Sequence, residues 1–290
     1  MDPLLEAVAR VLGAEVARSH PVHGGDVARA LCVDLADGRR VFAKTHADPP
    51  PGFFTTEATG LRWLREPGVI DVPAVLAASD GDDGGPALLV LEWIEVGAPR
   101  DATEAQLGLA LAALHRAELP AFGRSDRRTT GSRGLPNEPC ATWADFYATR
   151  RLAPLARLAR DARALGDAAI DALERLADPA RLAALGGADE PPARLHGDLW
   201  AGNRLVDDRG RSWLIDPAAH GGHREFDLAM MRLFGGFGPD CFAAYHEAHP
   251  LEAGWEDRVA LHQIAPLVVH AVKFGGSYRP AAERAIAQYA

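Results

Sequence analysis

The sequence predicts an α+β protein of two lobes, with an antiparallel sheet and a helix in the N-terminal lobe and mostly helices in the C-terminal lobe. Up to about residue 96, short apolar runs alternate with Gly, Asp and Pro turns, which is the pattern of paired strands. From about residue 103, leucine and alanine recur at helical spacing. A chain of 290 residues can bury a sizeable core and divide in two. We therefore expect an N-lobe over residues 1–96 and a C-lobe over residues 97–290.

The N-lobe is expected to begin with a short amphipathic helix and to continue with strands. Leucine and valine at helical spacing predict the helix over residues 3–13. Apolar runs bounded by turn residues predict strands at 14–20, 27–35, 40–45, 72–77 and 87–96. After the stiff linker at 49–52, apolar side chains again share one helical face, which predicts a helix that carries Glu57 in its first turn.

The C-lobe is expected to be a succession of helices. Thr103 followed by Gln106 is the pattern of a capping box, and it predicts a helix over residues 104–118 with His115 as a core or capping residue. Thr142 would start another helix, which Pro154 kinks or restarts. Three further helices are predicted at 167–185, 239–248 and 255–274, and another follows the polar segment Gly221–Glu225.

The candidate catalytic and metal-binding residues lie in one stretch from Leu195 to Asp216, LHGDLWAGNRLVDDRGRSWLID. Its two apolar runs flank a polar turn, so it predicts a β-hairpin that brings Asp216 back toward Asn203. Phosphoryl-transfer enzymes use an Asp that accepts a hydroxyl proton, and an Asn and a second Asp that hold magnesium. Asp198 is the expected base, and the oxygen ligands of Asn203 and Asp216 suit magnesium. Any one of the three is also a common turn residue, but all three together favour the phosphoryl-transfer interpretation.

Two features of the N-lobe fit a nucleotide site. Lys44 shares a strand face with Phe42, and a lysine that points into an apolar surface needs a partner. In kinases such a lysine pairs with a glutamate of the next helix and holds the phosphates, so we expect an ion pair between Lys44 and Glu57. Taken alone, these two residues are better explained as a surface lysine and an acid at a helix start, and the downstream Asp198 and Asp216 favour the ion pair. The Gly24–Gly25 turn could cover phosphates with its N–H groups, although most Gly-Gly pairs are only turns.

The fuller pattern resembles a known family. LHGDLWAGN at 195–203 and IDPAAHGGHREFDLAMMRLFGGF at 215–237 resemble the fructosamine kinase (ketosamine 3-kinase) family, within the kinase-like phosphotransferases that include aminoglycoside and choline kinases. The resemblance runs from about residue 24 to near the C-terminus. It implies a two-lobed protein-kinase-like fold, ATP and Mg²⁺, and as acceptor a ketosamine, free or on a protein lysine, phosphorylated at the oxygen of its third sugar carbon in deglycation repair.

The resemblance also assigns expected roles to further residues. It places the hinge that meets the adenine edge at Glu92, Trp93 and Ile94. Asp227 would hold the backbone of the catalytic loop, beside His196, although an acid in the first turn of a helix is nearly as good an interpretation. Trp200 would form an apolar wall against the sugar, with packing as the alternative. Three residues of the helical insert could also contact sugar, although packing and solvated charge are favoured: Trp143, Arg150 and Arg151.

Two other functions remain open at this point. An aminoglycoside or other small-alcohol phosphotransferase shares the HGD, Asn and Asp core, but is expected to lack LHGDLW and GHRE-x-DLAM. A nucleotide-binding pseudokinase would belong to another class, and the intact set of Lys44, Asp198, Asn203 and Asp216 weighs against it.

Composition excludes several classes of protein. The net charge of −9 and the lack of a long basic run argue against nucleic-acid binding. Three cysteines, far apart and without a CxxC pair, indicate neither a zinc site nor a disulfide framework. No apolar run is long enough to span a bilayer and no signal peptide is recognised, so we expect a cytoplasmic protein without membrane or obligate protein partners.

Overall fold

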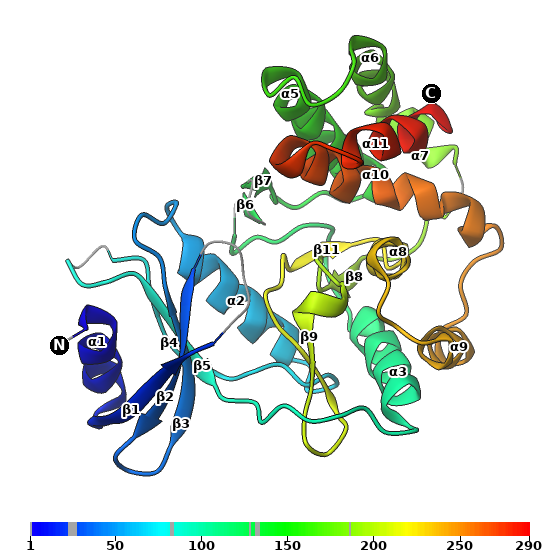
Figure 1. Cartoon of the computed structure of the whole chain (residues 1–290). Helices are drawn as coiled ribbons and strands as arrows, with labels where there is room; N and C mark the ends of the chain where they lie inside the picture. The colour runs from blue at the N-terminus through cyan, green and yellow to red at the C-terminus, as the bar shows by residue number, and fades with distance from the viewer. Residues whose placement is uncertain (1, 23–27, 82–83, 128, 131–133, 186) are drawn as a thin grey trace. The chain divides into compact units, whose positions relative to one another are not determined.

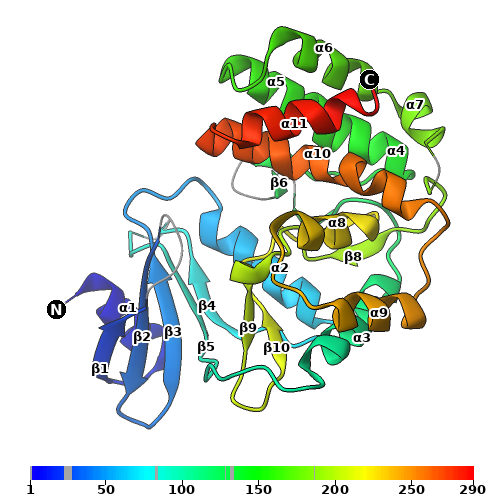
Figure 2. The same cartoon turned by 45° about the vertical axis from the view of Figure 1, so that its right-hand side comes forward.

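The computed structural model describes residues 2–22, 28–81, 84–127, 129–130, 134–185 and 187–290 (Figures 1 and 2). The chain divides into two compact units, which are described separately below. The first unit is Met1–Arg100 together with Leu205–Asp216, and the second is Asp101–Arg204 together with Pro217–Ala290. The hairpin that the sequence placed in the C-lobe therefore groups with the N-terminal residues.

A five-stranded antiparallel sheet forms the centre of the first unit. Its strands are β1 (Val16–Pro21), β2 (Arg29–Leu35), β3 (Arg40–Thr45), β4 (Val75–Ser79) and β5 (Leu88–Glu92), in the order β1-β2-β3-β5-β4. Helix α1 (Pro3–Leu12) buries Leu4 and Val8 against one face, where alternate strand residues such as Val41 and Ala43 meet it. The opposite strand face carries Lys44, as the alternation of the sequence predicts.

The sequence predicted Glu57 in the first turn of the helix after the stiff linker. That helix, α2 (Phe53–Arg65), begins too early for this. The carboxylate of Asp80, on a distant loop, accepts hydrogen bonds from Phe54 N at 2.8 Å and Thr55 N at 3.2 Å, and so satisfies two N–H groups at the helix start. The helix therefore starts at Phe53, and Glu57 lies in its second turn. The expectation of a first-turn acid was wrong because a capping group from another part of the chain sets the helix start.

The predicted hairpin is present as β9 (Arg204–Val206) and β10 (Ser212–Leu214). Asp207 organises its turn, because its carboxylate accepts hydrogen bonds from Arg211 N at 2.8 Å and from the indole N–H of Trp213 at 3.0 Å. Burial would raise the pKa of Asp207, but these hydrogen bonds outweigh burial and lower it to about 2. Backbone bridges from Asp71 and Val96 join the hairpin to the rest of the first unit.

The second unit is mostly helical, and many of its helices contribute to one apolar cluster. Its helices of at least eight residues are α3 (Thr103–Arg116), α5 (Ala153–Asp161), α6 (Asp167–Leu176), α8 (Glu225–Phe234), α9 (Pro239–Ala248), α10 (Trp255–Phe274) and α11 (Tyr278–Ala287). Its shorter elements are β6 (Thr129–Thr130), β7 (Leu135–Pro136), α4 (Trp143–Phe146), a π-helix (Tyr147–Leu152), α7 (Pro179–Ala183), β8 (Ala193–Leu195), a 3₁₀ turn (Ala201–Asn203) and β11 (His220–Gly222). Among the described residues, no helix combines the length and the apolar character needed to cross a bilayer.

Two of the predicted helix boundaries were wrong, each for a local reason. Thr103 is itself the first residue of α3 and is buried, so Ala102 takes the N-cap position that the capping box assigned to Thr103. The single helix predicted over 167–185 is two helices. Asp178 accepts hydrogen bonds from Ala180 N and Arg181 N, which makes it the N-cap of a new helix before Pro179.

Trp143 and Arg151 are packing residues, as the favoured interpretation held. Trp143 is 2% exposed and stacks on Tyr147. Arg151 is buried with its guanidinium 4.4 Å from the centroid of Phe146, and it donates to the carbonyl oxygen of Pro136 at 2.6 Å. The three cysteines are free thiols, two of them buried.

Candidate active site

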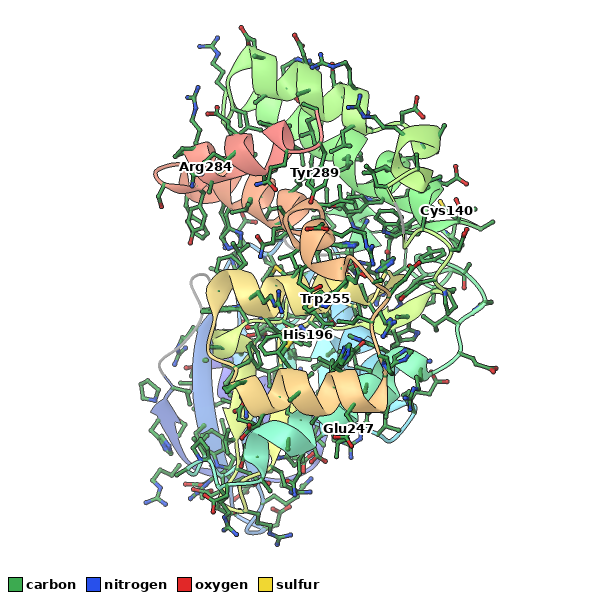
Figure 3. All side chains as sticks on the ribbon, turned by 90° about the vertical axis from the view of Figure 1, so that its right-hand side faces the viewer. Cys140, His196, Glu247, Trp255, Arg284 and Tyr289 are labelled. Carbon is green, nitrogen blue, oxygen red and sulfur yellow. The ribbon has the colours of Figure 1, made fainter. Side chains whose placement is uncertain are left out.

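The loop predicted to be catalytic follows β8 in the second unit, and its backbone is held by one buried carboxylate. Asp227 accepts hydrogen bonds from His196 N at 2.7 Å and Gly197 N at 2.9 Å. His196 is fully buried in the interior of this unit (Figure 3). Gly197 has a φ of +79°, and a Cβ there would collide with the carbonyl oxygen of Ala218. The chain can therefore make this turn into Asp198 only with glycine.

His115 supports this arrangement from α3. Its Nε2 lies 3.3 Å from Oδ2 of Asp227, the oxygen that also accepts from His196 N. Its Nδ1 lies 2.9 Å from the hydroxyl of Tyr245. Burial would raise the pKa of Asp227, but the hydrogen bond from His115 and the neighbouring charges outweigh it and lower the pKa. From the sequence, His115 was expected to be a core or capping residue, and this partner was not predicted. The two residues lie 112 positions apart, and no local pattern links them.

Asn203 orients the expected base. Its amide nitrogen donates to the carboxylate of Asp198 at 3.1 Å and to the carbonyl oxygen of the same residue at 2.8 Å. Asn203 is buried at the end of the 3₁₀ turn, whereas Asp198 is partly exposed. Because the amide nitrogen is engaged with Asp198, the amide oxygen is the atom of Asn203 that can serve as a metal ligand.

Trp200 lies in the same loop and is 42% exposed. Its indole covers Gly202, where a Cβ would collide with the ring, and it makes an edge contact with Phe234 at 6.4 Å between centroids. Gly236 lies against Ala201, and a Cβ at Gly236 would also collide. The two glycines therefore allow the loop to close tightly, and the indole is left at the surface.

In the first unit, Lys44 joins two carboxylates. Its ammonium lies 2.8 Å from Oε2 of Glu57 and 2.6 Å from Oδ1 of Asp216. Lys44 and Glu57 are almost buried, whereas the Asp216 side chain is 45% exposed. Burial works against the charged form of Lys44, but the two carboxylates outweigh it and raise the lysine pKa. The ion pair between Lys44 and Glu57 expected from the sequence is therefore present, with Asp216 as a further partner.

The single positive charge of Lys44 does not neutralise the two carboxylates of Glu57 and Asp216. Burial raises the pKa of Glu57 to about 8, and the buried Oε1 of Glu57 has no hydrogen-bond partner among the described atoms. Asp216 has a φ of +50°, a left-handed conformation that Asp tolerates better than most residues. A divalent cation at the exposed carboxylate of Asp216 would relieve the excess of negative charge, and carboxylate and amide oxygens are the ligands that magnesium prefers.

The remaining predicted site residues are placed as follows. Glu92 ends β5, and its carboxylate accepts a hydrogen bond from Ala74 N at 3.0 Å. Trp93 donates from its indole N–H to Glu95 at 3.0 Å, and Ile94 is buried. Their expected contact with adenine stays a prediction. The predicted phosphate turn at Gly24 and Gly25 lies outside the described residues.

The segment Gly221–Glu225, which its polarity predicts as a turn before the next helix, is a turn only around Arg224. It forms the end of β11 and the start of α8, and all of its residues are buried. Arg224 forms a two-point ion pair with Glu190, with both distances 2.6 Å, and Glu225 forms another with Arg258 at 2.6 and 3.0 Å. Polarity misleads here because charged side chains can be buried when they are paired.

His223, Glu225 and His262 lie close enough to share a metal ion, since one ligand atom from each is within 4.8 Å of the others. The contacts argue against this use. His223 is engaged through both ring nitrogens, at 2.8 Å to the carbonyl oxygen of Gly187 and 3.2 Å to Glu225 N. Both oxygens of Glu225 bind Arg258, whose positive charge opposes a cation. We interpret the cluster as structural.

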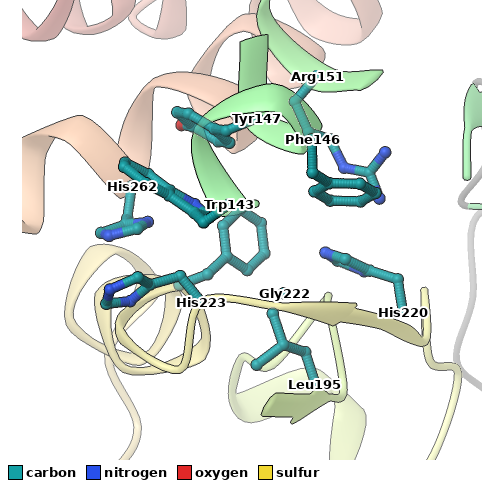
Figure 4. A pocket seen from close by; sticks show the side chains of 10 residues that line it. Trp143, Phe146, Tyr147, Arg151, Leu195, His220, Gly222, His223 and His262 are labelled. Atoms are coloured by element: carbon teal, nitrogen blue, oxygen red, sulfur yellow. The ribbon is translucent and has the colours of Figure 1, made fainter. Parts of the chain in front are cut away.

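These histidines and His220 line a cavity of about 10 Å³ beneath Trp143 (Figure 4), about the size of one water molecule. Burial is the largest cause that lowers the pKa of His220, to about 3, and that of His223, to about 4. Both rings therefore stay neutral in the folded protein at a pH where they are protonated in the unfolded chain. These two buried histidines therefore make the fold sensitive to acid.

We expect the free energy of unfolding to fall as the pH is lowered from about 6.5 toward 4. In that range the unfolded chain binds more protons than the folded one, so each of the two histidines adds a slope of about 1.4 kcal/mol per pH unit. Urea unfolding at several pH values measures the slope. The variant His220→Asn should lower the slope by about 1.4 kcal/mol per pH unit, the contribution of one proton. Equal slopes in wild type and His220→Asn would contradict this assignment.

Comparison with known proteins gives one consistent result. Residues 5–290 match the family described as fructosamine kinase. A protein of Thermus thermophilus named "probable ketoamine kinase" is 38% identical over 288 residues, which cover 99% of both chains. The chloroplastic protein-ribulosamine 3-kinase of Arabidopsis thaliana is 33% identical over 265 residues, covering 89% of this chain and 80% of the relative.

A solved structure gives the same result for the fold. The protein from Thermobifida fusca named "putative fructosamine-3-kinase" superimposes with a TM-score of 0.89 at 37% identity, covering 99% of this chain and 98% of that chain. The two-lobed kinase-like fold expected from the sequence is thereby confirmed. With its catalytic loop, its lysine–glutamate pair and this match over nearly its whole length, the chain belongs to the fructosamine kinase family.

Proposed function

We propose that this protein transfers the γ-phosphoryl group of ATP to the 3-hydroxyl of a ketosamine, such as a ribulosamine, erythrulosamine or fructosamine adduct. The observation that carries the proposal is the family match over residues 5–290, within which the HGDLW loop presents both Asp198 and an exposed Trp200. Asp198, oriented by Asn203, has the chemistry of the base. The phosphorylated adduct is less stable than its parent, so the reaction would serve deglycation repair.

In the proposed reaction the 3-hydroxyl oxygen of the sugar attacks the γ-phosphorus while its proton passes to the carboxylate of Asp198. The bond between the γ-phosphorus and the bridging oxygen breaks, and ADP leaves. Lys44, fixed by Glu57, steadies the phosphates. Asn203 and Asp216 would hold Mg²⁺, which neutralises charge on the phosphate oxygens. Positioning and charge stabilisation, rather than a covalent intermediate, supply the rate.

The rigid support of the loop belongs to this mechanism. A base that must meet a hydroxyl within hydrogen-bond distance cannot lie on a mobile segment. Asp227 fixes the two N–H groups that precede Asp198, and Asn203 fixes its carboxylate. The chain therefore positions the base before substrate arrives. Trp200, beside the base in sequence, would cover the apolar side of the sugar.

The proposal is tested by ATP consumption with Mg²⁺ across the ribulosamine, erythrulosamine and fructosamine adducts of lysine, with kanamycin and choline beside them. We expect turnover on at least one ketosamine and none on the other two acceptors. The Asp198→Asn variant serves as the control for contaminating kinases. Turnover on kanamycin or choline alone would overturn the ketosamine assignment, and ATP binding without turnover on any acceptor would favour a binding protein.

A further inference from the structure

An ion pair that the chemistry described above does not use anchors the exit of the predicted catalytic loop. Arg204 directly follows Asn203, and its Nη1 lies 2.6 Å from Oε1 of Glu104, in the first turn of α3. The Arg204 side chain is 6% exposed and that of Glu104 is 25% exposed. An ion pair at the surface contributes little, but a pair withdrawn from water in this way is held in one geometry. The backbone just after Asn203 is therefore tied to α3.

The other oxygen of Glu104 reaches a third segment. Its Oε2 accepts a hydrogen bond from Gly238 N at 2.7 Å, at the residue that precedes α9. The guanidinium carbon of Arg204 lies 5.6 Å from the ring centroid of Phe237, the neighbour of Gly238. One carboxylate thus joins the start of α3, the start of α9 and the end of the loop. We call Glu104 and Arg204 the exit clamp.

The helices that carry the exit clamp are themselves closely packed. Helices α3 and α9 lie side by side (Figure 2). A Cβ at Gly108 of α3 would collide with the carbonyl oxygen of Cys241 in α9, so the two backbones meet there. Toward the end of α3, His115 meets Tyr245 of α9 and supports the entrance of the loop, as described above. The same pair of helices therefore supports the loop at its entrance and, through the exit clamp, at its exit.

We propose that the exit clamp positions Asn203, so that the side-chain amide keeps the orientation that serves both the base and the metal ion. This inference rests on the proposed function in one respect, the role of Asn203 as a ligand of Mg²⁺. The amide nitrogen of Asn203 donates to Asp198, which leaves the amide oxygen for the cation. An amide that turned over would present N–H donors to the cation instead. Glu104 and Arg204 are thus positioning residues that act through Asn203.

Two other roles for the exit clamp predict different results. Arg204 carries a positive charge next to a predicted metal ligand, so by charge alone its removal should strengthen cation binding. A role in stability alone would lower the free energy of unfolding of a variant without changing the cation affinity of the folded protein. Only positioning predicts that loss of this positive charge weakens cation binding. The sign of the change therefore identifies the role.

The test measures Mn²⁺ binding in the presence of ADP by electron paramagnetic resonance, which needs neither an acceptor nor turnover. Arg204→Met keeps an unbranched apolar side chain without the guanidinium, and we expect it to weaken Mn²⁺ binding about tenfold. Arg204→Lys, which keeps a positive charge for Glu104, should recover part of the affinity. Arg160→Met is the matched control, because Arg160 also lies 2.6 Å from a glutamate, Glu174, in a more exposed pair that joins α5 to α6.

Glu104→Gln tests whether the two side chains act as a unit. The new amide can still accept from Gly238 N but offers Arg204 no charge. We expect weaker Mn²⁺ binding in this variant, and no further loss in Glu104→Gln/Arg204→Met beyond that of Arg204→Met alone, because both changes remove the same contact. Additive losses in the double variant would contradict the exit clamp. Urea unfolding identifies the variants that are folded. If Arg204→Met is not, Arg204→Lys and Glu104→Gln carry the test, and wild-type affinity in both overturns the inference.

The outcomes separate this inference from the proposed function. Unchanged or tighter Mn²⁺ binding in Arg204→Met overturns the exit clamp as a positioning device and leaves the kinase function standing, and so does an equal loss in Arg160→Met. If the wild type binds Mn²⁺ but turns over no ketosamine, the proposed function is refuted, while the effect of Arg204→Met on Mn²⁺ binding still decides the inference. A wild type that binds no Mn²⁺ with ADP refutes the metal role of Asn203, and the inference with it.

Discussion

Replacing Asp198 by Asn is expected to lower kcat on the ketosamine acceptor by about 10²–10⁴-fold, the usual contribution of a positioned general base. The amide occupies nearly the same volume but cannot take the hydroxyl proton. The affinity for ATP should be largely unchanged, because the phosphate-holding residues Lys44 and Glu57 lie in the other compact unit. Steady-state kinetics with a coupled ADP assay, and calorimetric titration with ATP and Mg²⁺, measure the two quantities separately.

A matched control for this variant is Asp208→Asn in the hairpin turn. Asp208 is an exposed acid whose side chain takes no part in the predicted chemistry. It should retain wild-type turnover. If Asp198→Asn keeps more than roughly a tenth of the wild-type kcat, well above the expected range, Asp198 is not the base and another group must accept the proton.

The second large effect is expected in Asp227→Ala, which should lower the free energy of unfolding by about 3–5 kcal/mol and abolish most of the activity. The carboxylate is fully buried and accepts from two backbone N–H groups and from His115. Its removal leaves these donors without an acceptor inside the protein, and an unpaired buried donor carries its full desolvation cost. The catalytic loop would also lose the contacts that set its backbone. Urea unfolding and kcat measure the two consequences.

Asp240→Ala is the control for Asp227, since both are acids in the first turn of a helix. Asp240 is exposed at the start of α9, whereas Asp227 is buried near the start of α8. A first-turn acid at the surface is worth only a few tenths of a kcal/mol to about one. If Asp227→Ala costs no more than Asp240→Ala, Asp227 is only a first-turn acid and does not hold the loop. Asp227→Asn, which keeps one acceptor oxygen, should fall between wild type and Asp227→Ala.

Local spacing in the sequence was sufficient to predict much of the arrangement. Strand alternation placed Lys44 on the face opposite Val41 and Ala43, and the structure has it there beside Glu57. The two apolar runs after Asn203 predicted the hairpin that leads to Asp216. The five-residue step from Asp198 to Asn203 places them in one loop, where they form a hydrogen bond. In each case the residues that matter are close in sequence or alternate within one element.

Predictions failed where a distant part of the chain decided the outcome. Asp80 set the start of α2, so Glu57 moved to the second turn. The sequence did not indicate that the GHRE segment is buried, because its partners, Glu190 and Arg258, are not its neighbours in sequence. A charged residue gives no local sign of whether it will be buried and paired, because the cost of burial is offset only when the fold brings an opposite charge to it.

The sequence by itself therefore determined the two-lobed fold, through its periodicity, and the family, through its motifs, and it predicted the groups that phosphoryl transfer would need from residues spaced within one loop or hairpin. Only the tertiary structure decided how those groups are held. Asp227 meets the predicted catalytic loop and His115 across long stretches of chain. Such contacts depend on chain closure and side-chain packing between elements, and no spacing within a single segment encodes them.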